Sequence, residues 1–315
     1  MSGPVTMASK VQAYLADRRR CGYALKIEGA QLMRFARFAD ATGYRGPLTT
    51  EVARRWATAS RRGRRITAAR RIEVLRSFAR YCQSFDPLSE IPPLHLFGPG
   101  HRRLVPHIYT QAEIRALMQA ALDLPPLGGL RGATCATVFG LIAACGLRIS
   151  EAMGLKRADV RFELGHLLVR HAKYGKSRLL PLHPTTLGAL RRYVRRRDRD
   201  PASGSSDSFF MFDNGRVPSA ANIRWAFTVL RKLLRWKARG GHPNLRIHDL
   251  RHTFVCRRLE RWYAEGQDID RHLHALSTYV GHVNVSDTYW YITATPDLLA
   301  RAAQRLAPPV SGGGP

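Results

Sequence analysis

The sequence predicts a mostly α-helical protein with one small antiparallel β-hairpin or sheet. Most of the 315 residues lie in segments whose apolar side chains recur three or four positions apart, the period of an amphipathic helix. Helix-start signals precede several segments, for example the capping box formed by Thr110 and Glu113. Strand-like runs bounded by turn residues are found over residues 160–183. The length is sufficient for two domains with substantial cores.

The first 88 residues are expected to form a helical domain. Apolar spacing marks helices before residue 20 and over 25–38, and Thr49 and Thr50 are placed to cap a helix over 51–59. A further helix over 68–85 follows a basic turn. The arginines of this turn are either phosphate contacts at a helix N-terminus or part of a solvated loop. Both interpretations stay open for Arg61, Arg62, Arg64 and Arg65.

A second domain is predicted over residues 109–307. Residues 89–108 before it are rich in Pro and Gly and show no period, so they are predicted to be a linker. Helices are expected in the second domain at 111–122, 133–145, 185–199 and 219–236. The chain is predicted to end in a short amphipathic helix at 295–306 and a disordered tail at 308–315.

Net charge is the strongest compositional signal. The formal charge is +28 and the isoelectric point about 11.1. Residues 1–88 carry eighteen Lys or Arg and six Asp or Glu, a net +12, which leaves +16 for the rest. A chain this basic is expected to bind a polyanion, and two basic domains are consistent with both binding one nucleic acid. Composition alone does not separate this class from ribosomal and other arginine-rich proteins.

Other totals favour a cytoplasmic protein. The longest apolar stretch, residues 134–147, is too short to span a bilayer, and no secretory signal is visible at the start. Five cysteines are odd in number and scattered, with no Cys-x-x-Cys pair. They favour a reducing compartment and argue against a disulfide framework or a zinc site. We therefore expect no membrane partner and no bound metal.

The stretch from Arg246 to Tyr291 carries the chemistry. His248 and Arg251 are three apart in R-I-H-D-L-R-H-T-F and share one helix face, and Tyr291 follows His282 by nine residues. Arginine offers a planar fork that matches phosphate, imidazole can bond and move a proton, and a tyrosine oxygen can act as a covalent nucleophile. Singly, such residues are more often a solvated helix face or core aromatics. As an ordered set they predict phosphoryl transfer through a phosphotyrosine.

Two upstream members complete this set. They are Arg148 in A-C-G-L-R-I-S-E-A and Lys173 in the predicted hairpin. With them the chain resembles the tyrosine recombinase (phage integrase) family, most of all its compact Xer-like and transposon-borne members. The resemblance covers the whole chain and implies a helical, SAM-like core-binding domain over roughly 6–86. It also implies an α-rich catalytic domain over roughly 109–305.

The resemblance implies a role for each matched position. Arg148 and Arg251 would bind the non-bridging oxygens of the scissile phosphate. His248 and His282 would complete this cradle, and His248 is also a candidate for taking the tyrosine proton. Tyr291 would attack phosphorus and form a 3′-phosphotyrosyl bond, which releases a 5′-hydroxyl. The stored bond energy would make a nucleotide cofactor unnecessary, and the sequence contains no phosphate-binding Gly-x-x-x-x-Gly-Lys loop.

The leaving oxygen would take its proton from a lysine of the hairpin. The family pattern G-K-G-x-K-x-R-x-x-P-L occurs here as A-K-Y-G-K-S-R-L-L-P-L, which aligns Lys173 with the catalytic lysine. The displaced glycine leaves Lys176 as the alternative. Only seven residues of the chain are lysine, and lysine, unlike arginine, can give up a proton. Lys176 and Arg178 are also predicted DNA contacts, and Glu151 is expected to support Arg148.

Some neighbours are interpreted as structural. His252 follows Arg251 and is expected to point elsewhere on the helix. Tyr289 is the rival nucleophile, but its spacing from His282 is two residues short. Cys256 and Trp290 are expected to be packing residues.

The predicted function is site-specific recombination of double-stranded DNA, in integration, excision or transposition. Four copies would act together on DNA, with the helix over 295–306 docking into a neighbouring subunit and with partner recombinases as a further option. A type IB topoisomerase-like enzyme would use similar chemistry as a monomer. A non-catalytic DNA-binding protein of the same fold is the third hypothesis, although every matched catalytic position is filled.

Overall fold

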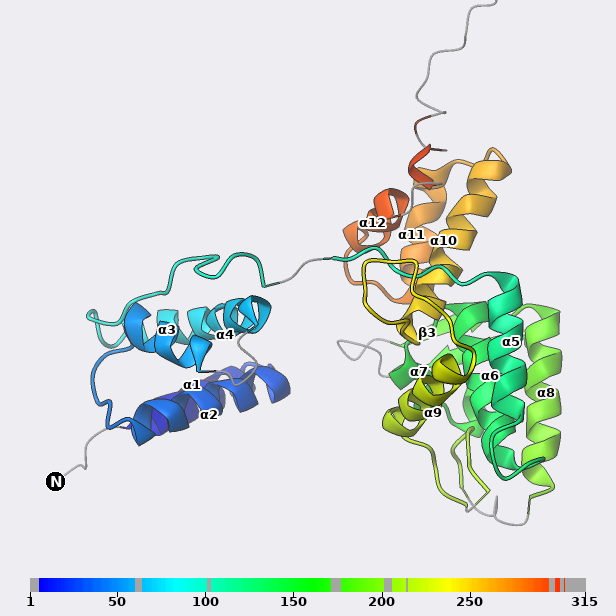
Figure 1. Ribbon diagram of the computed structural model, residues 1–315, viewed down its shortest axis with the longest axis horizontal. Coiled ribbons are helices and arrows are strands. Elements are labelled where there is room, and N and C mark those ends of the chain that lie inside the picture. Colours follow the sequence, from blue (N-terminus) through cyan, green and yellow to red (C-terminus); the bar gives the residue numbers. More distant parts are fainter. Residues whose placement is uncertain are drawn as a thin grey trace, which may run out of the picture. The chain divides into compact units, whose positions relative to one another are not determined.

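The computed structural model divides the chain into two compact units, Met1–Arg103 and Leu104–Pro315. Each is described by itself as the N-terminal and the C-terminal unit (Figure 1). The division falls inside the segment predicted to be a linker. The structure describes residues 6–59, 64–100, 103–170, 177–200, 206–213, 215–294, 298–300 and 303.

The N-terminal unit is helical in the part that the structure describes. Its helices are α1 Met7–Arg20, α2 Lys26–Ala41, α3 Thr50–Thr58 and α4 Arg65–Gln83. The predicted cap is present, because the Thr49 side chain accepts a hydrogen bond from the Val52 amide at 3.3 Å. Phe35 lies at the centre of the core, edge-on to Trp56 and Phe78 with ring centroids 5.4 and 6.5 Å away. Such edge-on aromatic pairs stabilise a small helical core beyond their buried area.

The predicted linker is shorter than expected. Its first half packs on the N-terminal unit, where Arg65 Nε donates to the Phe97 carbonyl at 2.7 Å and Arg70 Nε to the Gly100 carbonyl at 2.9 Å. Its last residues belong to the C-terminal unit, where the Gly241 amide donates to Val105 at 2.8 Å. The absence of an apolar period indicates that a segment is not helical, but it does not show that the segment lacks contacts with the neighbouring domain.

The C-terminal unit is built around α6, which is buried almost all round. This helix packs against α5, α8 and α10. It ends at Gly146, whose φ of +63° places it in the left-handed conformation that glycine adopts most readily. The helices of this unit are α5 Gln111–Leu122, α6 Leu130–Cys145, α7 Ile149–Met153, α8 Pro184–Asp198, α9 Ala220–Leu233, α10 His248–Ala264, α11 Ile269–Val280 and α12 Ser286–Ala294.

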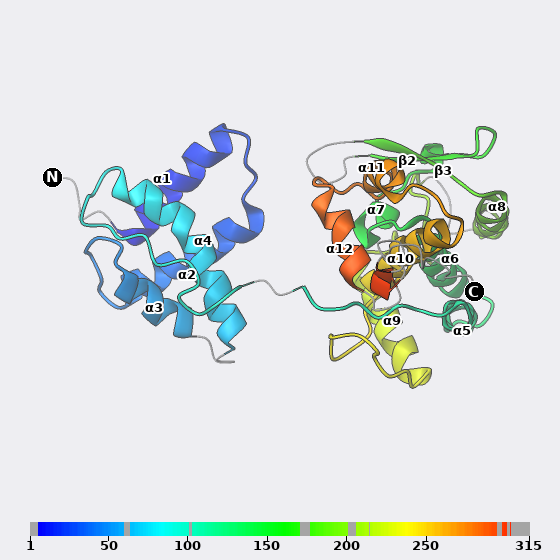
Figure 2. The same ribbon diagram turned by 90° about the horizontal axis from the view of Figure 1, so that it is seen from above.

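The predicted small antiparallel β-hairpin or sheet is confirmed and has three strands in the described residues. Its order is β1 Val160–Arg161, β2 His166–Val169 and β3 Arg178–Pro181. The first predicted run is split in two because Gly165, with a φ of +66°, turns the chain back on itself. A one-turn 3₁₀ helix, Arg157–Asp159, leads into the sheet. Figure 2 shows β2 and β3 on the side of the unit where α11 lies, and β3 contacts α11.

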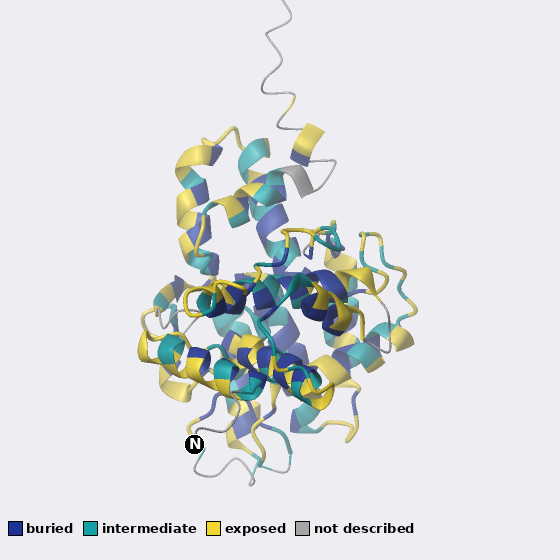
Figure 3. Cartoon of the chain, turned by 90° about the vertical axis from the view of Figure 1, so that its left-hand side faces the viewer, coloured by how far each residue is buried: buried dark blue, intermediate teal, exposed yellow. Residues whose placement is uncertain are grey.

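The described residues of the C-terminal unit form two hydrophobic cores, and α10 runs from one to the other. Leu250, near its start, belongs to the core around α6. Val255 and Leu259, further along, belong to a core shared with α11 and α12. Figure 3 shows the buried and exposed faces of these helices. The first turn of α10 is therefore held at the junction of the two cores.

No helix in the described residues is long and apolar enough to cross a membrane. The predicted helix over 295–306 lies mostly outside these residues, and the tail over 308–315 lies wholly outside. Leu298 is described, and its side chain is fully buried in the core shared by α10 and α11.

Candidate active site

Arg251 is a buried cation at the start of α10. Its side chain is 1% exposed, and Nη1 donates to the carbonyl of Gly146, where α6 ends, at 2.6 Å. No described residue accepts a hydrogen bond from Nη2. Burial, followed by repulsion from Arg148, lowers the pKa of Arg251 to about 10. A buried guanidinium with one amino group uncommitted is suited to an anionic ligand.

Arg148 and Arg178 share one carboxylate. Glu151 Oε1 accepts from Arg148 Nη1 at 2.8 Å and from Arg178 Nη1 at 3.1 Å, while Oε2 accepts from Arg178 Nη2 at 2.9 Å. Burial alone would raise the pKa of Glu151, but the hydrogen bonds from these arginines outweigh it and keep the pKa below its usual value. Glu151 stays ionised and fixes Arg148, as expected for a supporting residue.

Gly281 lets the loop after α11 approach both arginines. Arg148 Nη2 donates to its carbonyl at 2.8 Å, and Arg178 Nε donates to the carbonyl of Tyr279 at 2.8 Å. The φ of Gly281 is +70°, and a Cβ at this position would lie 2.7 Å from Arg178 Nη1. Glycine is therefore required on two grounds, conformation and space. This close approach places the next residue, His282, beside the arginine cluster.

His282 and Tyr291 face each other across the turn between α11 and α12. Their rings are nearly parallel, with centroids 6.1 Å apart. His282 Nδ1 is hydrogen-bonded to Thr288 Oγ1 at 2.7 Å, which fixes the ring. Tyr291 is 3% exposed and packs in the core of α10, α11 and α12. The contrasting Tyr289 is 44% exposed, and its hydroxyl donates to Asp270 at 2.8 Å on the outer side of α11.

His252 is the site residue that sequence reasoning misplaced. Its Nδ1 lies 2.7 Å from the hydroxyl oxygen of Tyr291, and its ring is edge-on to that of His248 with centroids 4.7 Å apart. The prediction that His252 points elsewhere was wrong because it compared this residue only with its neighbour Arg251. His252 is four residues after His248, and residues four apart share a helix face. That spacing was the available signal.

The imidazoles of the cluster are held neutral. Burial and the adjacent cations lower the pKa of His252 to about 2 and that of His282 to about 3. The pKa of His248 is lowered to about 4, first by desolvation and then by Arg251, Arg246 and Arg148. His248 is nevertheless exposed at its edge, so solvent screens its shift more than the other two.

These depressed pKa values predict acid destabilisation. In the unfolded chain a histidine takes up its proton near pH 6.5, whereas folded His252 and His282 do so only near 2 and 3. The unfolded state therefore binds more protons below pH 6.5, and stability is lost as the pH falls through this window. Each histidine contributes about 1.4 kcal/mol per pH unit. Urea unfolding at constant ionic strength should show a loss of up to ~4 kcal/mol between pH 7 and pH 5 from these two groups.

The variant His282→Asn serves as the control for this titration. It removes one proton-binding group, so the slope of unfolding free energy against pH should fall by about 1.4 kcal/mol per pH unit. A stability that does not change between pH 7 and pH 5 would contradict the neutral, buried state of these imidazoles.

The structure brings five of the six predicted catalytic residues into one cluster. They are Arg148, His248, Arg251, His282 and Tyr291, joined through the contacts above. Lys173 and its alternative Lys176 lie outside the described residues, so the general acid stays a prediction.

The predicted DNA-contact residues differ in their surroundings, and some of them lie outside the described residues. Arg61 and Arg62 lie outside the described residues, while Arg64 and Arg65 are exposed at the start of α4, which begins three residues earlier than expected. Arg178 needs correction, because its guanidinium is 11% exposed and all three of its nitrogens are engaged by Glu151 and Tyr279. Its geometry is that of a support for the cluster rather than of a direct DNA contact.

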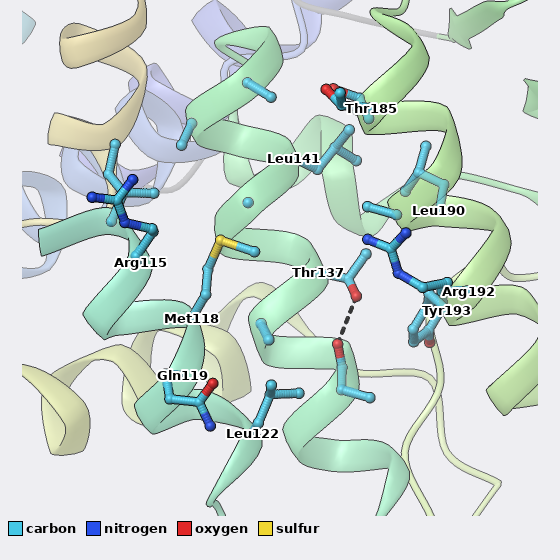
Figure 4. Close-up of a pocket in the computed structure, with 18 of the residues that line it drawn as sticks. Arg115, Met118, Gln119, Leu122, Thr137, Leu141, Thr185, Leu190, Arg192 and Tyr193 are labelled. Atoms are coloured by element: carbon cyan, nitrogen blue, oxygen red, sulfur yellow. Dashed lines mark hydrogen bonds between the residues drawn. The ribbon is translucent and has the colours of Figure 1, made fainter. Parts of the chain in front are cut away.

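A separate groove of about 790 Å³ lies over α6, between α5 and α8. Figure 4 shows Met118 and Leu122 on one wall and Leu190 and Tyr193 on the other, with Thr137 and Leu141 between them. Small residues of α6 form its floor, and Thr253 and Arg257 represent α10 in its lining. The groove holds none of the predicted catalytic residues.

The sequence is similar to those of known integrases and recombinases. The Phage integrase family model matches residues 108–297. A putative integrase/recombinase of Sinorhizobium fredii, y4rB, is 38% identical over 305 residues, which cover 96% of this chain and 97% of that protein. The tyrosine recombinase XerC of Oceanobacillus iheyensis is 29% identical over 249 residues, covering 79% of this chain and 76% of XerC.

Solved structures share the fold. The Tn1549 transposon integrase in complex with transposon right end DNA superposes with a TM-score of 0.68 at 19% identity, covering 96% of this chain and 100% of that one. The XerH site-specific recombinase bound to its palindromic difH substrate gives a TM-score of 0.66 at 16% identity, covering 93% and 83%.

The chain belongs to the phage integrase family, the tyrosine recombinases. Within this family it is a tyrosine-type site-specific recombinase, an enzyme.

Proposed function

We propose that this recombinase cuts and rejoins double-stranded DNA through a bond between Tyr291 and a 3′ phosphate, in the integration, excision or transposition of a mobile element. The observation that carries the proposal is the cluster formed by two arginines, His282 and Tyr291. His282 faces the Tyr291 ring, and Arg148 is bonded to the carbonyl of Gly281, the residue before His282. Arg251 lies close enough to Arg148 and Tyr291 to interact electrostatically with both. Relatives named as integrases and a transposon integrase bound to DNA support the biological context.

In the proposed reaction the phosphate binds between the two arginines. Arg251 offers the uncommitted Nη2, and Arg148 is 25% exposed, so its guanidinium is accessible from solvent. Fixed cations stabilise the charge that gathers on the phosphoryl oxygens in the transition state. His248, exposed at the start of α10, would add a hydrogen bond. The phenol of Tyr291 is covered, so the groups around it must move when DNA binds.

The hairpin lysine would serve as the general acid. Lys173, with Lys176 as the alternative, protonates the departing 5′-oxygen, because an ammonium can give up a proton near neutral pH more readily than a guanidinium. No nucleotide cofactor or metal enters this scheme, since the phosphotyrosyl bond keeps the energy needed for rejoining.

Basic residues of both units would hold the DNA. The net charge of +28 supports a large electrostatic contribution, and Arg64 and Arg65, exposed at the start of α4, would contact the backbone in the N-terminal unit together with Arg61 and Arg62. The active assembly would be a tetramer on DNA, with the segment 295–306 reaching a neighbouring subunit and partner recombinases as an option. The protein would act in the cytoplasm.

The test uses purified full-length protein and a nicked suicide duplex carrying the ends of the element that encodes it. The expected product is a covalent protein–DNA adduct on the 3′ side of the cut, with a free 5′-hydroxyl on the other. Adducts that lead to strand exchange between two duplexes support a recombinase. Relaxation of supercoiled DNA by monomers without exchange would favour the topoisomerase-like activity, and binding without any cleavage would favour a non-catalytic protein.

A further inference from the structure

We propose that His252, rather than His248, accepts the proton of Tyr291 when this tyrosine attacks the DNA phosphate. This inference rests on the proposed function and assigns one proton transfer within it. It is carried by the position of His252 Nδ1, 2.7 Å from the hydroxyl oxygen of Tyr291. A general base must lie within hydrogen-bond reach of the proton that it removes, and this distance meets that requirement.

The other two imidazoles are placed for different tasks. His282 presents the face of its ring to the ring of Tyr291, and its Nδ1 is engaged by Thr288 at 2.7 Å. His248 is exposed at the first residue of α10, and its ring meets the ring of His252 edge-on. His248 therefore lies on the solvent side, where a phosphate would bind, and His252 lies between it and the phenol.

The proposed step balances in both directions. In cleavage the Tyr291 Oη–P bond forms and the P–O5′ bond breaks; the phenolic proton moves to His252 Nδ1, and the 5′-oxygen takes a proton from the hairpin lysine. In rejoining the 5′-hydroxyl attacks phosphorus and gives its proton back to the hairpin lysine, while the Oη–P bond breaks and His252 returns its own proton to Oη. No oxidant, metal or further reactant is needed.

The surroundings of His252 make its basicity depend on bound DNA. In the free protein, burial and then His248, Arg246, Arg251 and His282 disfavour the imidazolium. A phosphate held by Arg148 and Arg251 places a negative charge beside these groups and favours the protonated imidazole. The phenol therefore stays protonated without substrate, and His252 becomes an effective base once the phosphate is in place.

The experiment compares His252→Asn with His252→Ala on the nicked duplex under single-turnover conditions. The Asn side-chain oxygen can replace Nδ1 as a hydrogen-bond acceptor but cannot take a proton. We expect both variants to form adduct roughly 10²–10⁴-fold more slowly than wild type. Adduct formation by His252→Asn at near the wild-type rate would show that His252 only positions the hydroxyl, and would overturn the inference.

A second substrate separates the two proton transfers. A 5′-bridging phosphorothiolate has a sulfur leaving group that needs no proton. It should restore cleavage by Lys173→Ala, if Lys173 is the general acid, and leave His252→Asn slow. Restoration of His252→Asn by this substrate would place its defect at the leaving group and contradict the proposal. If His248→Asn cleaves slowly on both substrates while His252→Asn does not, the base is His248.

Controls exclude misfolding and failure of the wider proposal. The variant His274→Asn changes an exposed histidine of α11 and should cleave like wild type. DNA affinity and melting temperature should be similar for His252→Asn and wild type. If wild type forms no adduct, the proposed function fails. If wild type cleaves and His252→Ala cleaves equally fast, this inference alone fails.

Discussion

Tyr291→Phe is expected to abolish the covalent protein–DNA adduct while DNA binding is retained. The substitution removes one oxygen atom, the only atom of this side chain that can bond to phosphorus. The ring keeps its stacking on His282, and loss of the hydrogen bond to His252 should cost about 1 kcal/mol of stability. Denaturing gels of the nicked-duplex reaction measure the adduct, and a gel-shift titration measures binding.

Tyr289→Phe is the matched control. Tyr289 lies on the same helix two residues earlier, and its hydroxyl is committed to Asp270 on the outer face. We expect adduct formation within about twofold of wild type, since a surface change away from the site moves stability by only ~0.5 kcal/mol. An adduct that persists in Tyr291→Phe and disappears in Tyr289→Phe would reverse the assignment of the nucleophile.

Arg251→Met is expected to impair cleavage severely while leaving the fold as stable as wild type, or more stable. Methionine fills a similar volume without charge. Loss of one fixed donor to the phosphoryl oxygens typically costs roughly 10²–10³-fold in rate, and loss of a full cation should cost at least that. The measurement is the single-turnover rate of adduct formation beside the urea midpoint of the same sample.

The stability side of this prediction follows from burial. A guanidinium whose pKa is lowered from 12.5 to about 10 is destabilised in the fold by roughly 3 kcal/mol at neutral pH. Replacing a buried charge with an apolar side chain is often neutral or stabilising by about 1–4 kcal/mol, although the Gly146 carbonyl loses its partner here. A fall in stability of more than about 2 kcal/mol would show that Arg251 is mainly structural.

Arg261→Met is the control on the same helix. Arg261 is 67% exposed and pairs with Glu265 at 2.6 Å. Solvent screens an exposed ion pair of this kind, so neither activity nor stability should change measurably. Together the two variants separate a charge retained for chemistry from one retained at the surface.

Local patterns were sufficient for most of the secondary structure. The helix Gln111–Leu122 begins and ends at the residues predicted from the capping box and the apolar period. Both signals depend on contacts between residues no more than four positions apart in the sequence. Gly146 ends α6 for an equally local reason, its left-handed conformation. The β region was predicted in place but not in number of strands, since the turn at Gly165 was interpreted as part of a strand.

The sequence by itself determined the residue types and the order of the phosphate-binding and nucleophilic side chains, because these depend on chemistry and spacing along the chain. Only the tertiary structure decided which of them touch. His252 is hydrogen-bonded to Tyr291, and Arg178 donates hydrogen bonds to Glu151. Both contacts join residues of different helices and strands. Those contacts depend on how α10 crosses between two cores and how closely Gly281 lets a loop approach, and neither property is encoded in local spacing.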